Sequence, residues 1–219
     1  MEINQIIPSH ILTLFDEHCV QEWMTRARYE FRKGEQIEYP DKLSKEIYLI
    51  VEGNARIYHL HTDGKECVLG IARPGDFIDI AGLFAQTFGN LFATALTETV
   101  VVKIAKAEII EQVLKTPQLT LALLQYFANQ LNETRVILEQ VAYEKVEERL
   151  INLLQKLADR TQANGEWAPL PSYLTHKDMA GMIASTRETV TFLINKLIQS
   201  GQLRIDNQRL WIGLNHQAD

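Results

Sequence analysis

The stretch LTHKDMAGMIASTRETVTFLINKL, at residues 174–197, has the pattern of two short helices joined by a turn. Thr175 is followed three positions later by Asp178, and Ser185 by Glu188, which is the capping-box spacing of a helix N-terminus. After the second predicted cap, apolar residues recur at helical spacing and predict a face that packs against a core. These residues are Val190, Leu193, Ile194 and Leu197.

The other side of the second predicted helix carries a small, mixed polar tip. It holds Arg187, Glu188, Thr191, Phe192 and Asn195. Side chains of this kind suit the major groove of DNA, where base edges offer hydrogen-bond donors and acceptors. An ordinary helical hairpin on the surface of an enzyme has the same local pattern, so the rest of the chain has to decide between the two interpretations.

Composition describes an ordinary folded chain. Its 219 residues allow one large domain or two small ones, and 46% hydrophobic with 23% charged residues argues against wholesale disorder. No apolar run approaches the ~20 residues of a membrane span, and the start of the chain lacks a signal pattern. Cys19 and Cys67 are too few for a disulfide framework, so a reducing cytoplasm is expected, with a redox switch between the two thiols left open.

The net charge of -6 is unusual for a nucleic-acid binder, so its distribution matters more than its sum. Residues 1–143 hold 13 Lys and Arg against 19 Asp and Glu, whereas residues 144–219 hold 9 of each. Phosphate neutralisation needs local positive charge, and the less acidic C-terminal part is therefore the favoured DNA-facing end.

The pattern of residues 28–104 predicts many short strands with turns between them. An N-terminal helix is predicted around Pro8 to Trp23, and regular short strands with glycine-rich turns favour a sandwich, jelly roll or small barrel. The turn patterns are Lys33-Gly34, Glu52-Gly53-Asn54, Asp63-Gly64 and Pro74-Gly75-Asp76.

A long helix is predicted to start at Pro117, because no glycine or further proline follows before Asp159. A helix of this kind would be roughly 40 Å long, and pairing with its own copy in a parallel dimer is its natural use. The alternative is a helix that packs along the β domain. The polar run EKVEE at 144–148 predicts a hinge or break. The predicted dimer seam is Leu124, Phe127, Leu131, Thr134, Leu138 and Val141.

A small hairpin is predicted after the two-helix unit. Gly201 stands at a C-cap position, and Leu203 to Ile205, a turn at Asp206-Asn207 and Leu210 to Ile212 follow. Helix, two-helix unit and hairpin together are the winged form of the helix-turn-helix.

Five motifs, in this order, resemble the CRP/FNR family of bacterial transcription regulators over nearly the whole chain. They are KGE at 33–35, YLIVEG at 48–53, DGK at 63–65, PGDF at 74–77 and STRETV at 185–190. The resemblance implies an α+β chain with a cyclic-nucleotide-binding-like β-sandwich or jelly-roll sensor domain over 1–115, a dimerisation helix over 116–143 and a winged helix-turn-helix DNA-binding domain over 144–219. It further implies a cytoplasmic homodimer that is not an enzyme, binds a two-fold symmetric site on double-stranded DNA and has RNA polymerase as a partner.

In that family the second helix of the unit enters the major groove. By position, Arg187 would read a guanine, Glu188 would accept from a cytosine or adenine amino group, and Thr189 would contact phosphate. Family members usually have another Arg where this chain has Phe192, so we expect a relaxed or altered preference at one base pair. The predicted DNA contacts are Thr175, Lys177, Ser185, Thr186, Arg187, Glu188, Thr189, Thr191, Phe192 and Lys196.

The sensor domain departs from the members that bind cyclic nucleotides. Ile80 and Ala81 stand where those members carry Glu and Leu, and no basic residue lies between Gly75 and Val102 to neutralise a phosphate. Iron–sulfur members need four cysteines, and haem-binding members place Cys and His where this chain has Asp79 and Ala81. Neither a cyclic nucleotide nor a metal or cofactor is therefore expected.

The run GNLFATA, residues 89–95, is similar to regulators that sense halo-aromatic compounds. An apolar pocket for an unidentified small-molecule effector, aromatic or weakly charged, is therefore expected. The predicted pocket residues are Ile80, Ala81, Leu83, Asn90, Leu91, Phe92, Thr134 and Arg135.

One alternative is a metal-dependent, cupin-like enzyme that uses His59, His61 and Glu66. His-x-His on a strand places both imidazoles on one face, and a carboxylate could complete a facial triad. The Asp63-Gly64 turn should displace the carboxylate, and no His follows until residue 176. A purely structural, scaffolding dimer is a third hypothesis, which predicts no sequence-selective DNA binding.

Overall fold

The computed structural model describes residues 11–37, 45–62, 64, 66–85 and 91–214. The chain divides into two compact units, Met1–Thr134 and Arg135–Asp219. Within the described part, no helix is long and apolar enough to cross a membrane.

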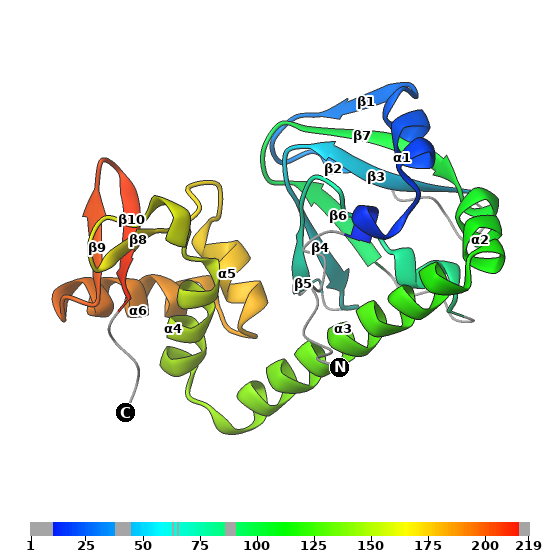
Figure 1. Ribbon diagram of the computed structural model, residues 1–219. Helices are drawn as coiled ribbons and strands as arrows, with labels where there is room; N and C mark the ends of the chain where they lie inside the picture. Colours follow the sequence, from blue (N-terminus) through cyan, green and yellow to red (C-terminus); the bar gives the residue numbers. More distant parts are fainter. Residues whose placement is uncertain (1–10, 38–44, 63, 65, 86–90, 215–219) are drawn as a thin grey trace. The chain divides into compact units, whose positions relative to one another are not determined.

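The first unit is built on two antiparallel sheets, as the strand pattern predicts (Figure 1). One sheet has the order β1-β7-β3 and the other the order β2-β6-β4-β5. Their bounds are β1 Arg28–Phe31, β2 Gln36–Ile37, β3 Glu46–Glu52, β4 Ala55–Leu60, β5 Glu66–Ala72, β6 Leu91–Ala95 and β7 Thr99–Ala105.

Two of the predicted turns join these strands where the backbone requires glycine. Gly53 carries the chain from β3 in one sheet to β4 in the other with a φ of +82°, and a β-carbon there would lie 2.1 Å from the carbonyl oxygen of Glu98. Gly64, with a φ of +82°, donates its amide to the carbonyl of His61 at 2.9 Å between the paired strands β4 and β5. The predicted hairpin is therefore confirmed.

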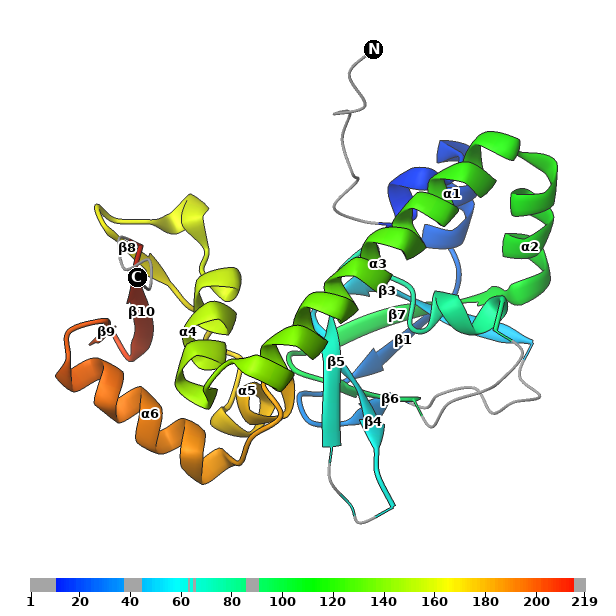
Figure 2. The ribbon, with the colours of Figure 1, turned by 90° about the horizontal axis from the view of Figure 1, so that it is seen from below.

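Two cores hold the first unit together. The inner core lies between the sheets, and the outer core lies between the three-stranded sheet and a layer of helices. Figure 2 shows α2 leading into the beginning of α3 in that layer. The helices are η1 Ile11–Leu14, α1 Glu17–Met24, η2 Ile80–Leu83, α2 Lys106–Lys115 and the first half of α3 Pro117–Tyr143.

The single N-terminal helix predicted around Pro8 to Trp23 is wrong in one respect. Asp16 accepts the amide of His18 and caps a new helix, so the segment is divided into η1 and α1. Residues before Ile11 lie outside the described part. Trp23 is buried, and its indole N–H donates to Glu108 at 3.3 Å. Arg26, which follows the C-cap of α1, donates to both oxygens of the same carboxylate, at 2.7 and 3.0 Å, and so ties the end of this segment to α2.

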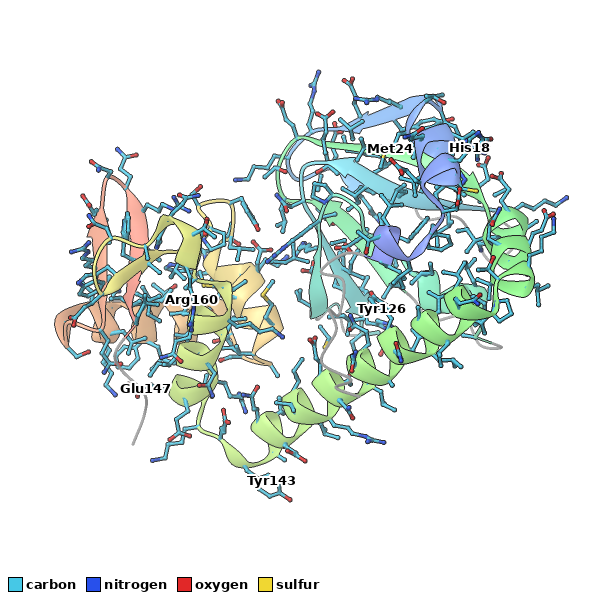
Figure 3. All side chains as sticks on the ribbon, in the orientation of Figure 1. His18, Met24, Tyr126, Tyr143, Glu147 and Arg160 are labelled. Atoms are coloured by element: carbon cyan, nitrogen blue, oxygen red, sulfur yellow. The ribbon has the colours of Figure 1, made fainter. Side chains whose placement is uncertain are left out.

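α3 begins at Pro117 and ends at Tyr143, which confirms the predicted start, and the predicted break follows at Glu144 and Lys145. Arg149 of α4 (Val146–Leu157) donates to the carbonyl of Val141 at 3.1 Å and so satisfies the end of α3. The phenol of Tyr143 points away from the helix into solvent (Figure 3).

The second unit packs three helices on a three-stranded sheet of order β8-β10-β9. Gly201, with a φ of +77°, donates to the carbonyl of Ile198, and Gln202 donates to that of Leu197, which confirms the predicted C-terminal cap. The elements that follow α4 are η3 Arg160–Gln162, β8 Trp167–Pro169, α5 His176–Met182, α6 Arg187–Gln199, β9 Leu203–Asp206 and β10 Arg209–Gly213.

The hairpin of β9 and β10 turns one residue later than predicted. Asn207 and Gln208 both have positive φ, so they are the two central residues, and Asp206 pairs with Arg209 as the last rung of the ladder. On the face of this sheet away from the core, the guanidinium of Arg204 lies 4.5 Å from the Trp167 ring and 5.5 Å from the Trp211 ring.

Candidate DNA-binding surface

The first helix of the two-helix unit starts with the predicted capping box. The hydroxyl of Thr175 accepts the amide of Asp178 at 3.2 Å, and the carboxylate of Asp178 accepts the amide of Thr175 at 2.8 Å. Two amides at the start of α5 are therefore satisfied without a solvent partner.

The second helix is capped by Thr186 and not by Ser185, so this prediction is wrong by one residue. Ala184 has a φ of +49°, and the amide of Ser185 turns back to donate to the carbonyl of Ala180 at 2.9 Å. Ser185 therefore closes the end of α5. Thr186 Oγ1 accepts the amide of Thr189 at 3.2 Å, and α6 begins at Arg187.

α6 has one buried and one exposed face, as predicted. Its apolar residues Val190, Leu193, Ile194 and Leu197 belong to the core of the second unit. Arg187 and Glu188 in its first turn are exposed, and 68% of the surface of Phe192 is accessible. The first turn therefore presents one cation and one anion beside an apolar ring.

Several predicted DNA contacts have partners inside the protein. Thr191 donates its hydroxyl to the carbonyl of Arg187 at 2.8 Å. The hydroxyls of Thr186 and Thr189 lie 2.9 Å apart. The ammonium of Lys196 lies 2.6 Å from a carboxylate oxygen of Glu147 on α4, the helix marked by Glu147 in Figure 3. Lys177 is exposed at the start of α5.

His176 is a residue of this surface that the sequence does not single out. Its Nδ1 atom lies 2.8 Å from Thr191 Oγ1, so it joins the two helices. Burial, and then the positive charge of Arg187, lower the pKa of His176 below its ordinary value. An isolated histidine in a sequence has no periodicity or spacing that would predict such a contact.

α3 carries an exposed row of leucines. The predicted seam residues Leu124, Leu131 and Leu138 are exposed at intervals of seven residues. Phe127 instead packs toward the outer core, with its ring 5.9 Å from that of Phe84, so it is a poor member of the predicted seam. Leu121 is exposed one turn before Leu124 and extends the row.

Tyr126 lies on the core-facing side of α3, and Figure 3 shows its side chain on the sheet side of the helix. Burial is the main reason why the pKa of Tyr126 is raised. The remaining seam residues, Thr134 and Val141, are both exposed, and Thr134 donates its hydroxyl to the carbonyl of Gln130 at 2.8 Å.

The structure does not bring the predicted effector-pocket residues together as one lining. Ile80 is a buried member of the outer core, and Leu83 packs against the same core. Phe92 lies on β6 of the other sheet, stacked on Tyr58 at 5.7 Å. Of the other predicted residues, Leu91 lies on β6, Ala81 and Arg135 are exposed, Thr134 bonds within its own helix, and Asn90 lies outside the described residues.

The three residues of the cupin alternative do not form a metal site. His59 pairs with Cys67 across β4 and β5, and Glu66 pairs with the next residue, Leu60, so Glu66 lies on the opposite face of the sheet from His59. The carboxylate of Glu66 is 2.6 Å from the guanidinium of Arg56. In the ranges that the structure describes, no group of three His, Cys, Asp or Glu side chains could hold a metal ion. Cys19 and Cys67 are both free thiols.

Comparisons with known proteins agree with this architecture. Residues 28–116 match the cyclic nucleotide-binding domain, and residues 148–217 match the Crp-like helix-turn-helix domain. A transcriptional regulator of Thermus thermophilus, SdrP, is 28% identical over 83% of this chain and 88% of its own. The nitrogen fixation regulation protein FixK of Bradyrhizobium diazoefficiens is 29% identical over 81% of this chain and 74% of its own.

The solved structure of the c-di-GMP responsive global regulator CLP of Xanthomonas campestris has the same fold. It superposes with a TM-score of 0.73 at 19% sequence identity, and the match covers 90% of this chain and 99% of that one. The fold and the α5–α6 surface thus define a DNA-binding transcription regulator with a helix-turn-helix domain. The chain belongs to the CRP/FNR family.

Proposed function

We propose that the chain acts as a homodimeric, sequence-specific transcription regulator in the cytoplasm. In this proposal residues 1–115 are the sensor domain, 116–143 the dimerisation helix and 144–219 the DNA-binding domain. The observation that carries the proposal is the first turn of α6, where Arg187 and Glu188 are exposed on a helix whose other face is fixed in the core.

Arg187 and Glu188 are the proposed base readers. A guanidinium that donates two hydrogen bonds to a guanine discriminates against other bases by about 1–3 kcal/mol, and a carboxylate accepts from the amino group of cytosine. Phe192, exposed one turn further along, has no polar group to offer and suits the methyl group of thymine. Thr175 and Lys177 at the start of α5 and Ser185, Thr186 and Thr189 near the turn suit the phosphate backbone. Thr191 and Lys196 have partners inside the protein, as Thr175, Thr186 and Thr189 also do.

The exposed leucine row of α3 is the proposed dimer interface. Leucines at intervals of seven residues suit the seam between two parallel helices, where each copy covers the other. A two-fold dimer places its two recognition helices about 34 Å apart, on half-sites one helical turn of DNA from each other. RNA polymerase is the proposed partner once the dimer is bound to DNA.

The proposed effector is a small molecule other than a cyclic nucleotide. The sensor has Ile80 where cyclic-nucleotide-binding members carry the Glu that holds the ribose hydroxyl, and residues 75–102 contain no Arg or Lys for a phosphate. The effector would bias a two-state break between Tyr143 and Val146, and this requires different contacts in the two states.

The test is selection of binding sites from random DNA with the purified protein, followed by affinity measurements on the enriched site. Arg187→Ala should lose roughly 5- to 150-fold in discrimination at one base pair of each half-site. Arg160→Ala is the matched control, because it removes the same charge from η3 of the same domain (Figure 3).

Three outcomes would contradict the proposal. Retained discrimination in Arg187→Ala would refute the assigned reader, and enrichment of no sequence at all would refute sequence-specific binding. An increase in affinity on addition of cyclic AMP or cyclic GMP would refute the effector assignment.

A further inference from the structure

A chain of two hydrogen bonds links α5 to the first turn of α6. His176 is the first residue of α5, and its Nδ1 atom lies 2.8 Å from the hydroxyl of Thr191. Thr191 lies one turn into α6, and the same hydroxyl donates to the carbonyl of Arg187 at 2.8 Å. The chain therefore ends on the first residue of α6.

The direction of these bonds follows from the number of protons. A threonine hydroxyl has one hydrogen, and the carbonyl of Arg187 only accepts, so the hydroxyl of Thr191 donates to that carbonyl and accepts from His176. Neutral His176 then carries its hydrogen on Nδ1. The hydrogen bond from His176 to Thr191 therefore constrains the orientation of α5 relative to α6, in addition to the apolar packing between them.

The hydrogen bond between His176 and Thr191 is not needed to start α5 or to hold α5 against the core of the second unit. Thr175 and Asp178 already satisfy the first amides of α5, and Met179, Ala180 and Ile183 already bury its inner face. Apolar packing leaves a helix some freedom to roll about its axis, whereas the bond from His176 fixes the side of α6 that faces α5. Since the chain ends on the backbone of Arg187, a roll of α6 would change where the Arg187 guanidinium points.

We infer that His176 is a positioning residue for DNA reading, which holds the first turn of α6 in orientation through the hydroxyl of Thr191. The inference rests on the proposed function, in which Arg187 reads a base. Bidentate contacts tolerate displacements of only about 0.5 Å or 10–20°, so a small roll of α6 weakens the specific contact more than it weakens general attraction to phosphates.

Four variants distinguish the effect of losing the hydrogen bond from the effect of changing the size and shape of the side chains. His176→Phe keeps a ring without the donor, whereas His176→Asn keeps an amide donor near the position of Nδ1. Thr191→Val keeps the shape of the side chain without the hydroxyl, whereas Thr191→Ser keeps the hydroxyl. The measured quantity is the ratio of the affinity for the selected DNA site to the affinity for unrelated DNA, at one salt concentration.

His176→Phe and Thr191→Val should each lower this ratio by roughly 3- to 30-fold, with little change in the affinity for unrelated DNA. The double variant should be no worse than the more severe single one, because both changes break the same chain of bonds. His176→Asn and Thr191→Ser should recover most of the loss, which a defect in packing alone would not allow.

The inference and the proposed function fail in different ways. If wild-type protein selects a site and both His176→Phe and Thr191→Val keep the wild-type ratio, the inference is overturned and the proposed function stands. Additive losses in the double variant, or failure of both conservative variants to recover the ratio, would also overturn it. If wild-type protein selects no site, the proposed function is refuted and the inference with it. Should His176→Phe fail to fold, Thr191→Val and Thr191→Ser decide alone.

Discussion

The ammonium of Lys196 lies 2.6 Å from the carboxylate of Glu147, so an ion pair joins α6, the proposed recognition helix, to α4. Lys196 is exposed and Glu147 is half-buried, and a pair of this kind contributes at most about 1 kcal/mol to stability. If α6 binds DNA as proposed, the larger effect of the pair is on the charge that α6 offers to the phosphates.

Glu147→Gln should release Lys196 to the DNA backbone. We expect affinity for DNA to rise and the slope of log affinity against log salt concentration to steepen by up to about one unit, because one more counterion is displaced. Lys196→Gln should leave the slope close to that of the wild type. Binding titrations over a range of salt concentrations measure both slopes, and a full unit lost in Lys196→Gln would show that the lysine leaves its partner for a phosphate.

Thr186→Ala should destabilise the second unit by about 1 kcal/mol, because it removes the oxygen that accepts the amide of Thr189 at the start of α6. Ser185→Ala is the matched control, and we expect a change within about 0.5 kcal/mol, since Ser185 contributes its backbone amide to the turn. Chemical unfolding of the two variants distinguishes them. Equal losses would contradict the assignment of Thr186 as the cap.

Phe192→Arg should create a new base preference, since an added guanidinium on the exposed face of α6 contributes about 1–3 kcal/mol at one base pair. Phe192→Ala should leave stability almost unchanged, because the ring is mostly accessible to solvent. Site selection with wild-type protein and both variants gives the preference at each position. Identical sites for the wild type and Phe192→Arg would show that this position does not face the bases.

The stability of the DNA-binding domain should depend on pH through His176. Its pKa is lowered from 6.5, first by burial and then by the charge of Arg187, so below pH 6.5 the unfolded chain binds this proton more readily than the folded one. The free energy of unfolding should therefore fall as pH decreases from 6.5 toward the lowered pKa. His176→Asn should remove this part of the pH dependence.

Arg187→Gln should raise the pKa of His176 toward its ordinary value, because the second of the two causes is removed. An NMR titration of the imidazole in both proteins measures the change. A pKa that stays the same would mean that the guanidinium does not act on the ring in solution.

Leu131→Glu should separate the proposed dimer without unfolding the protein, because Leu131 lies in the exposed leucine row and 52% of its surface is accessible. Val136→Glu is the matched control. Val136 has the same exposed fraction, but it lies five residues further on and is rotated by about 140° around the helix. Sedimentation of the two variants gives the oligomeric state, and a monomer in both, or in neither, would argue against this interface.

Local patterns predicted much of the fold. The capping box at Thr175, the start of α3 at Pro117 and the left-handed Gly201 are all set by neighbours in the sequence, and the structure confirms them. The errors of one residue, at Ser185 and in the β9–β10 turn, arose because a non-glycine residue takes a positive φ in each turn. Sequence patterns signal such conformations strongly only for glycine.

The surroundings of some predicted site residues could not be read from the sequence for a different reason, because they depend on tertiary contacts. The heptad spacing predicts both Phe127 and Leu131 as seam residues. Only the contact with Phe84 in the structure shows that Phe127 packs against the outer core. The resemblance places Ile80 in the effector pocket, whereas the structure buries it in the outer core. The cupin alternative groups Glu66 with His59, whereas strand pairing places Glu66 on the other face, beside Arg56.

The distribution of the three tryptophans gives each unit its own optical reporter. Trp23 is buried in the outer core of the first unit, whereas Trp167 and Trp211 flank Arg204 in the second. With both of the latter replaced by phenylalanine, the fluorescence of the remaining indole would follow the sensor domain alone. A ligand search could then proceed without DNA, on a signal that comes from inside the domain expected to receive the ligand.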